Sequence, residues 1–211
     1  MYYKNRRDAA LKLATYLNKY KNEDSVLLAI PRGGVPIAYY IAKQNNIPIE
    51  LLMTKKIGHP SNLEFAIGAV SLEDEIIDRR HNISNTYIND AVKRIRENMI
   101  KKYQLFMGNR KPMKLENKVV IIVDDGIATG NTILSSIPML RKQNPKKIIV
   151  AVPVAPPEIA TKLKKVVDDF ICPYTPHDFF GVGYHYQDFS EVSDDEVIHL
   201  LEDIHHVKKH I

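Results

Sequence analysis

Several features that would set a chain apart from ordinary globular proteins are missing from this sequence. Its single cysteine, Cys172, excludes an internal disulfide and follows the apolar pair Phe170-Ile171, which is typical of a buried structural thiol. No apolar run approaches membrane-spanning length, and the first residues, Tyr-Tyr-Lys-Asn-Arg-Arg after Met1, include no hydrophobic signal core. Repeats and low-complexity linkers are absent. With 45% hydrophobic and 26% charged residues, the chain is expected to be one soluble, cytoplasmic domain spanning residues 1–211.

The order of the expected elements predicts an α/β fold. Helical patterns cover Arg7–Tyr20, Val35–Gln44, Ser84–Phe106, Thr132–Asn144, Glu158–Lys164 and Asp194–Ile204. Strand patterns cover Val26–Ile30, Glu50–Thr54, Phe65–Leu72, Val119–Val123, Lys147–Val152 and Asp168–Ile171. This alternation implies a mainly parallel, twisted sheet with helices on both faces and right-handed crossovers.

The segment from Val119 to Thr132 carries the strongest chemical signal. A strand buried on both faces runs into Asp124-Asp125 and then into a small-residue loop that opens a helix. Such a loop lies at the carboxyl edge of the sheet, where its N–H groups, hydroxyls and helix dipole suit a phosphate dianion. Each piece alone is typical of an ordinary turn or helix start, but their joint order favours a sugar-phosphate site. No Lys follows Gly130 and no G-x-G-x-x-G pattern occurs, so the loop is neither a Walker loop nor a dinucleotide fingerprint.

This stretch resembles the 5-phosphoribosyl-1-pyrophosphate (PRPP) motif of type I phosphoribosyltransferases. Four apolar residues, an acidic pair and a loop ending in Thr-Gly-x-Thr match from Val120 to Thr132, although many members carry an aliphatic or small polar residue at Gly126. The resemblance implies that Asp124 and Asp125 bind the ribose hydroxyls and hold Mg²⁺ through water. It assigns the remaining PRPP contacts of this loop to Gly126, Ile127, Ala128, Thr129, Gly130, Asn131 and Thr132.

A second match lies upstream, in Val26–Ala38. A short apolar strand there ends in Pro31-Arg32-Gly33-Gly34, which lets the backbone approach an anion while Arg32 supplies charge. Alone, the segment would be typical of a glycine-rich turn with an exposed arginine. In the resembled family it is the pyrophosphate loop, which often holds a cis peptide just before the basic residue, here the Pro31–Arg32 bond.

Between these motifs, residues 51–68 read as a strand followed by a mobile loop over Gly58–Asn62. In similar enzymes a flexible loop in this region closes over PRPP and shields a reactive sugar cation from water. Adjacent strand residues face opposite ways, so one of Lys55 and Lys56 is expected at the site, with Lys55 preferred. Solvated surface lysines are the alternative. The expected catalytic set is Arg32, Lys55, Asp124 and Asp125.

The acceptor is expected to bind near the segment 172–192, a loop rich in Gly, Pro and aromatic residues that resembles the hood of type I members. Candidate acceptor contacts are Phe179, Phe180, Tyr184, Tyr186 and Asp188, although most of the aromatics are expected to pack onto the core, with one or two free. Members that salvage 6-oxopurines usually place an Asp where Ala128 stands and a Lys near the end of the next strand, here Ile148–Pro153. The Phe65–Val70 and Gly181–Tyr186 segments look most like an uncharacterised branch of the family.

The charge of +5 is unevenly spread. Residues 93–118 hold nine Lys or Arg and two acidic residues, which is compatible with an RNA-binding face but more typical of a solvated helix and loop. His205, His206 and His210 lack the carboxylate or Cys partners of a metal site and read as surface histidines.

These observations favour a Mg²⁺-dependent transferase that moves the 5-phosphoribosyl group from PRPP to a nitrogenous acceptor. The expected partners are PRPP, an unidentified small-molecule acceptor and a second copy of the chain in a homodimer, with no membrane. A PRPP- or nucleotide-sensing regulator, able to bind RNA, is the alternative. The sequence shows no convincing general base.

Overall fold

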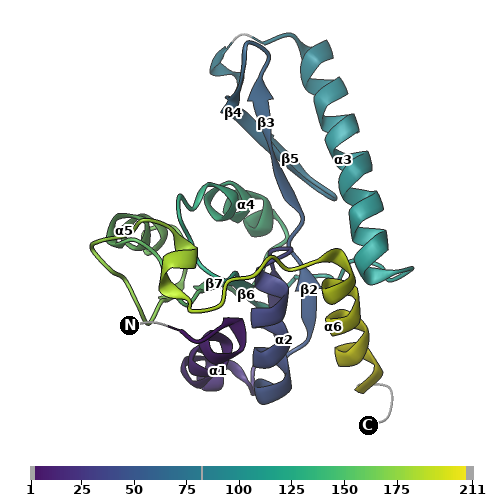
Figure 1. Ribbon diagram of the computed structural model, residues 1–211. Coiled ribbons are helices and arrows are strands. Elements are labelled where there is room, and N and C mark those ends of the chain that lie inside the picture. Colours follow the sequence, from purple (N-terminus) through teal and green to yellow (C-terminus); the bar gives the residue numbers. More distant parts are fainter. Residues whose placement is uncertain (1–2, 82, 208–211) are drawn as a thin grey trace.

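The computed structural model describes residues 3–81 and 83–207, whose strands form a parallel sheet and a smaller antiparallel one (Figure 1). The parallel sheet has the order β2-β1-β6-β7-β8. Its strands are β1 (Ser25–Ala29), β2 (Ile49–Leu51), β6 (Val119–Val123), β7 (Lys147–Ala151) and β8 (Asp169–Ile171). All neighbouring strands in it are parallel, which confirms the predicted α/β class.

Helices cover both faces of this sheet, and the strand residues divide between them in alternation. Along β6, Val119, Ile121 and Val123 face one hydrophobic cluster, whereas Val120 and Ile122 face the other. The first cluster is closed by α1 (Arg6–Leu17), α2 (Gly34–Asn45) and α6 (Asp194–Val207). The second is closed by α4 (Asn131–Lys142) and α5 (Pro157–Leu163). Burial on both faces explains the unbroken apolar runs of these strands.

An antiparallel sheet and a long helix project from the parallel sheet (Figure 1). The sheet has the order β3-β4-β5, with β3 (Thr54–His59), β4 (Asn62–Ser71) and β5 (Glu75–Ile77), and it packs against α3 (Asn85–Met107). We call β3, β4, β5 and α3 the arm. The arm has a small hydrophobic core of its own, which includes Ile57, Ile67, Val70, Ile88 and Val92.

The arm corrects two sequence predictions. The single strand expected over Glu50–Thr54 is divided, because β2 ends at Leu51 in the parallel sheet and β3 begins at Thr54 in the other. The loop expected at Gly58–Asn62 is the tip of a β-hairpin, with pairing up to His59 and Asn62 and an irregular register at Gly58. Among the residues of β3, Ile57 alone is fully buried, so this strand has no apolar alternation to signal it.

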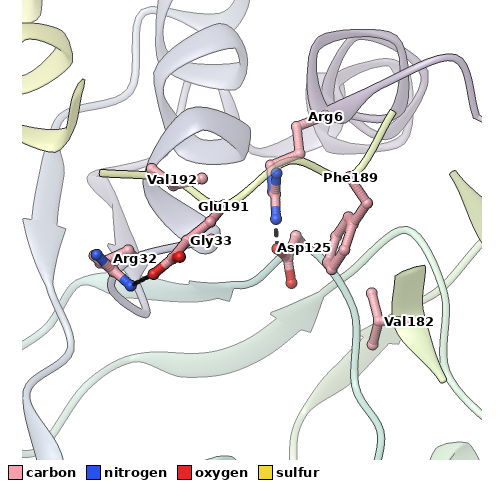
Figure 2. A pocket seen from close by; sticks show the side chains of 8 residues that line it. All are labelled: Arg6, Arg32, Gly33, Asp125, Val182, Phe189, Glu191 and Val192. Carbon is pink, nitrogen blue, oxygen red and sulfur yellow. Dashed lines mark hydrogen bonds and ion pairs between the residues drawn. The ribbon is translucent and has the colours of Figure 1, made fainter. Parts of the chain in front are cut away.

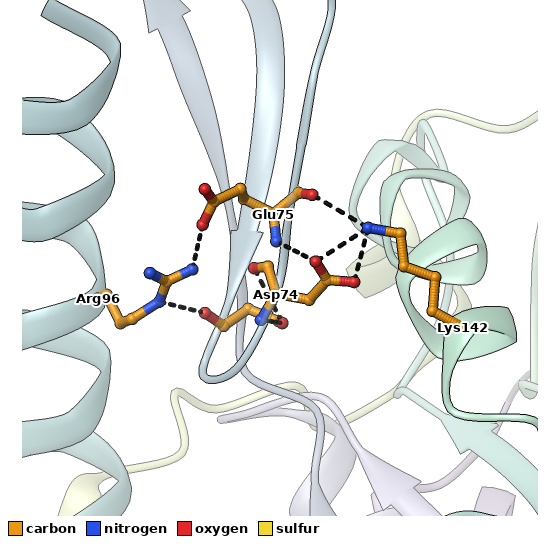
Figure 3. Close-up of polar contacts among 5 residues, drawn as sticks. Asp74, Glu75, Arg96 and Lys142 are labelled. Carbon is orange, nitrogen blue, oxygen red and sulfur yellow. Dashed lines mark hydrogen bonds and ion pairs between the residues drawn. The ribbon is translucent and has the colours of Figure 1, made fainter. Parts of the chain in front are cut away.

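Polar contacts tie the base of the arm to its surroundings (Figure 3). Arg96 of α3 donates to the Ser71 carbonyl oxygen at 3.3 Å and pairs with the Glu75 carboxylate. Lys142 of α4 donates to Asp74 Oδ1 at 2.9 Å and to the Glu75 carbonyl oxygen at 3.4 Å. The turn between β4 and β5 is therefore held between a helix of the arm and a helix of the parallel sheet.

Short 3₁₀ helices occupy Asn18–Tyr20, Arg79–His81 and Val182–His185. Across residues 3–81 and 83–207, no helix has both the length and the apolar content needed to cross a membrane. The side chains of His205 and His206, and all of His210, lie outside the described residues.

Candidate active site

The loops that follow β1 and β6 meet at the carboxyl edge of the parallel sheet, because these two strands are neighbours. Two glycines allow the contact. A Cβ atom on Gly33 would lie 2.1 Å from Asp125 Oδ2, and one on Gly34 would lie 2.6 Å from the Val123 carbonyl oxygen. The Pro31–Arg32 peptide bond is cis, as the resemblance led us to expect. The predicted pyrophosphate loop therefore packs directly against the predicted ribose carboxylates.

The acidic pair is held from several sides. Asp124 Oδ1 accepts a hydrogen bond from the Asp125 backbone N–H at 2.9 Å, and the Tyr186 hydroxyl donates to the Asp125 carbonyl oxygen at 2.6 Å. Asp125 Oδ2 accepts from Arg6 Nε at 2.8 Å. Burial raises the pKa of both carboxyl groups; the charge of Asp125 raises the pKa of Asp124 further, whereas Arg6 opposes the rise at both.

The predicted phosphate loop ends at an open helix N-terminus. Gly130, with φ +71°, precedes α4 and has no side chain to cap it, and the one described side-chain contact to this end is a long hydrogen bond of 3.5 Å from the Asn131 backbone N–H to Thr129 Oγ1. Ala128, Thr129, Asn131 and Thr132 are exposed, so backbone N–H groups and hydroxyls at this end of α4 are accessible. Gly126 and Ile127 are buried, and Ile127 packs into the sheet core. The burial of these two residues holds the loop against the core of the sheet.

A cleft of about 1220 Å³ separates this edge from the arm. Pro31, Arg32, Asn131 and Thr132 line it on the side of the parallel sheet. The arm contributes Lys55, Lys56, Glu64, Phe65, Met99 and Lys102. The predicted pyrophosphate and phosphate loops thus share one cleft that the arm covers.

Both Lys55 and Lys56 border this cleft, whereas strict alternation along a strand predicted that one of them would. β3 is an edge strand of the arm's sheet, and the cleft also takes lining residues from β4 and from α3. Lys56 Nζ lies 2.8 Å from Glu64 Oε2 in an exposed ion pair across the hairpin.

A smaller hollow of about 520 Å³ lies on the other side of Arg32 (Figure 2). It is lined by Arg6, Arg32, Gly33, Asp125, Val182, Phe189, Glu191 and Val192. Arg32 points toward Glu191 and forms an ion pair with it, and its second terminal nitrogen lies 3.7 Å from Asp194 Oδ1. The predicted pyrophosphate arginine therefore rests between carboxylates of the chain's own C-terminal part.

The predicted hood aromatics divide into exposed and packed groups. Phe180 and Tyr184 are 79% and 69% exposed, with ring centroids 5.9 Å apart. Phe179 stacks on His185 at 5.3 Å, and Tyr186 is 7% exposed. Phe180 and Tyr184 thus remain open to a ligand, as expected. The Tyr186 ring is buried and is not open to stacking on an acceptor. Asp188 is exposed and accepts a hydrogen bond from the Ser190 backbone N–H at 3.1 Å.

Sequence reasoning missed Arg6, Phe189 and Glu191, which the fold brings to the smaller hollow, and Lys102, which reaches the cleft from α3. Arg6 gave one signal that could have been noticed. It lies at the first position of a helix, where a cation opposes the helix dipole, so a partner elsewhere in the structure was to be expected.

Comparison with known proteins agrees with this geometry. Residues 2–188 match the model of the phosphoribosyl transferase domain, and the chain belongs to this family. One relative is a protein of Mycobacterium tuberculosis (strain ATCC 25618 / H37Rv) that carries the provisional name phosphoribosyl transferase. The two sequences are 34% identical over 207 residues, and the alignment covers 95% of this chain and 46% of the M. tuberculosis protein. The chain thus spans about half the length of the curated relatives it matches. The crystal structure of TT1426 from Thermus thermophilus superimposes with a TM-score of 0.87 at 31% identity, covering 96% of this chain and 99% of TT1426.

Proposed function

We propose that the protein transfers the 5-phosphoribosyl group from PRPP to a nitrogen nucleophile and releases pyrophosphate. The observation that carries this proposal is the contact between the two motif loops, in which Gly33 packs against the Asp125 carboxylate beside the open N-terminus of α4. The contact brings an anion-binding backbone, an acidic pair and Arg32 to one edge of the sheet.

Each part of PRPP has a complementary surface there. The 5-phosphate would bind the N–H groups and hydroxyls of Thr129–Thr132, because a helix N-terminus favours a dianion. Asp124 and Asp125 would accept hydrogen bonds from the ribose hydroxyls. Arg32 and the Gly33-Gly34 backbone would hold the departing pyrophosphate, and Lys55 borders the same cleft with a further positive charge.

Loss of pyrophosphate leaves positive charge on the ribose, in a transition state that resembles an oxocarbenium ion. Burial raises the pKa of both Asp124 and Asp125, so their ionised forms depend on nearby positive charge, which Arg6 supplies and the ribosyl cation would increase. Ionised carboxylates there would stabilise the developing charge, and the arm would keep water away from the sugar cation.

We propose that Mg²⁺ binds here as an ion shared between the protein and PRPP. Within residues 3–81 and 83–207, no group of three or more His, Cys, Asp or Glu side chains could hold a metal ion. Asp124 and Asp125 would hold Mg²⁺ through water, with PRPP oxygens completing its shell, since this ion keeps several waters and binds few carboxylates. When bound, the ion would neutralise charge on the pyrophosphate.

Binding is tested with PRPP and Mg²⁺ on the whole chain. PRPP should raise the melting temperature by mass action, and the double variant Asp124→Asn, Asp125→Asn should largely remove that shift. The double variant Asp90→Asn, Glu116→Gln changes charge equally at two exposed carboxylates and should leave the shift intact. An unchanged shift in the first double variant would refute the assigned ribose contacts.

Turnover is tested by pyrophosphate release with a panel of bases. Release that depends on both PRPP and a base would support the transferase. PRPP binding without release for any base would instead favour the PRPP-sensing regulator.

A further inference from the structure

Arg6 lies outside both sequence motifs yet contacts the acidic pair (Figure 2). Its Nε donates to Asp125 Oδ2 at 2.8 Å, and the two side chains are 12% and 13% exposed. A charge-assisted hydrogen bond shielded in this way is screened less by water and salt than an ion pair on the surface.

The other side of the Arg6 side chain contacts the hood segment. The guanidinium carbon lies 4.0 Å from the centroid of the Phe189 ring, and a terminal nitrogen donates to the Ser190 carbonyl oxygen at 2.7 Å. Arg6 thus joins Asp125 to Phe189 and Ser190, which lie more than 60 positions further along the chain. A planar guanidinium suits this arrangement because it stacks on an aromatic face while it donates in its own plane.

Stability of α1 does not explain this arginine. A cation in the first turn of a helix opposes the helix dipole, and the N-cap function is already served by Asn5, whose side chain accepts from the Asp8 backbone N–H at 3.0 Å. The neighbouring Arg7 is exposed, with its guanidinium 5.6 Å from the Tyr40 ring, and it lines neither the cleft nor the smaller hollow.

The contact also fixes how Asp125 is presented to a sugar. Arg6 engages Oδ2, the oxygen that packs against Gly33, and a carboxylate has lone pairs on both oxygens. Because Gly33 and Arg6 confine Oδ2, the carboxylate has little freedom to rotate, and Oδ1 keeps a defined direction for a ribose hydroxyl.

We propose that Arg6 is a positioning residue for PRPP, which orients the Asp125 carboxylate and couples it to the Phe189-Ser190 segment of the hood. This inference rests on the proposed function. It makes the N-terminal helix a part of the sugar-binding site, although none of the motif residues lies on that helix.

The test compares Arg6→Met, Arg6→Lys and the matched control Arg7→Met, measuring the Kd of PRPP with Mg²⁺ by calorimetry and the melting temperature without ligand. Arg6→Met should weaken PRPP binding about 10- to 100-fold, by analogy with the loss of residues that orient metal-binding side chains. Arg6→Lys keeps the charge but loses the stacking plane, so it should recover part of the affinity. Arg7→Met should bind PRPP as the unchanged protein does.

The outcomes separate the two proposals. If the unchanged protein fails to bind PRPP, the proposed function falls and the role of Arg6 falls with it. If the unchanged protein binds PRPP and Arg6→Met lowers the melting temperature without changing the Kd, Arg6 is a structural ion pair and the inference alone is wrong. Should Arg6→Met fail to fold, Arg6→Lys decides: an unchanged Kd in that variant would overturn the positioning role.

Discussion

The parallel sheet and the arm serve one cleft but are built in different ways. In the parallel sheet, β1 and β6 are buried along their whole length and packed on both faces. In the arm, β3 has a single fully buried residue, and its sheet packs on one face against α3. The loops that would hold the sugar are therefore attached to a large core, whereas the region that would cover it depends on a much smaller one.

The charges of the two regions differ in the same way. At the sheet edge, Asp125 forms a shielded ion pair with Arg6, whose side chain is 12% exposed against 13% for Asp125. The arm presents its charges at the surface, as in the ion pair between Lys56 and Glu64, where Glu64 is 90% exposed. Exposed ion pairs contribute little to stability, and their side chains change position easily. The difference indicates that the sheet edge would orient the ligand, whereas the arm would supply charges that can adjust to it.

The largest expected effect comes from one substitution made in each region. Ile121 of β6 and Ile57 of β3 are both fully buried. Ile121→Ala should lower the free energy of unfolding by about 2–5 kcal/mol and loosen the whole sheet. Ile57→Ala should act locally, because the arm has a separate core.

Hydrogen exchange measures this difference. In Ile57→Ala, amide protection should fall in β3, β4 and β5 and persist in β1 and β6. Equal loss of protection in both regions would show that the arm and the parallel sheet unfold as one unit. That result would contradict the idea that the arm depends on a separate core.

The same contrast explains what the sequence could and could not predict. The strand Val119–Val123 was predicted with its observed bounds, because burial on both faces requires a continuous apolar run. β3 was missed because it has one buried residue, and β5 because none of its three residues is buried, so neither strand shows a readable alternation. The segment from Gly58 to Asn62 was interpreted as a mobile loop because hairpin tips, here Pro60 and Ser61, and loops use the same residue types.

The candidate site divides in a similar manner. Arg32, Gly33 and Asp125 were predicted because each lies in a local motif, and the structure brings them together. Arg6 reaches Asp125 across 119 positions of the chain, and no local pattern encodes such a contact. This contact exists only once the chain is folded.

The next effect in size concerns the acceptor. Ala128 cannot exchange a proton, and β7 ends at Ala151 with Val152-Pro153 and no Lys, so a 6-oxopurine would leave polar groups unpaired. Each unmet buried group should cost about 1–3 kcal/mol. We expect little transfer to hypoxanthine or guanine in parallel assays with adenine, orotate and uracil. A kcat/KM near about 10⁴ M⁻¹s⁻¹ for either 6-oxopurine would refute this expectation and move acceptor recognition away from the sheet edge.

A smaller effect is expected at the junction of the two regions. Lys142→Met removes the contacts of α4 with Asp74 and the Glu75 carbonyl oxygen. The ion pair is partly exposed, so its loss should lower stability by less than about 1 kcal/mol, and salt should reduce the difference further. Faster amide exchange in β5 would be the local sign of a loosened arm. The exposed Lys162 offers a matched control, Lys162→Met, which should change neither quantity. A loss of several kcal/mol would show that the arm depends on this junction more than on its own core.

The smallest expected effect concerns pH and the packed side of the comparison. His185 is 5% exposed between the rings of Tyr174 and Phe179, and neither ring nitrogen has a hydrogen-bond partner among the described residues. Burial lowers the pKa of His185 below its ordinary value of 6.5, so the folded chain holds this ring neutral. Between these two pKa values the unfolded chain binds more protons at this position than the folded chain does. The stabilising contribution is therefore fully present above about pH 6.5 and is lost as the pH falls through the folded pKa.

His185→Phe should remove this dependence, because a phenyl ring suits the same aromatic neighbours and takes up no proton. Denaturant unfolding at a series of pH values from about 7.5 to about 5.5 should give a shallower loss of stability for His185→Phe than for the unchanged chain. The exposed His177 provides the control, and His177→Gln should keep the slope of the unchanged chain. If the free energy of unfolding falls equally with pH in the unchanged chain and in His185→Phe, water reaches His185 in solution. The hood would then be packed less tightly around this side chain than the structure indicates.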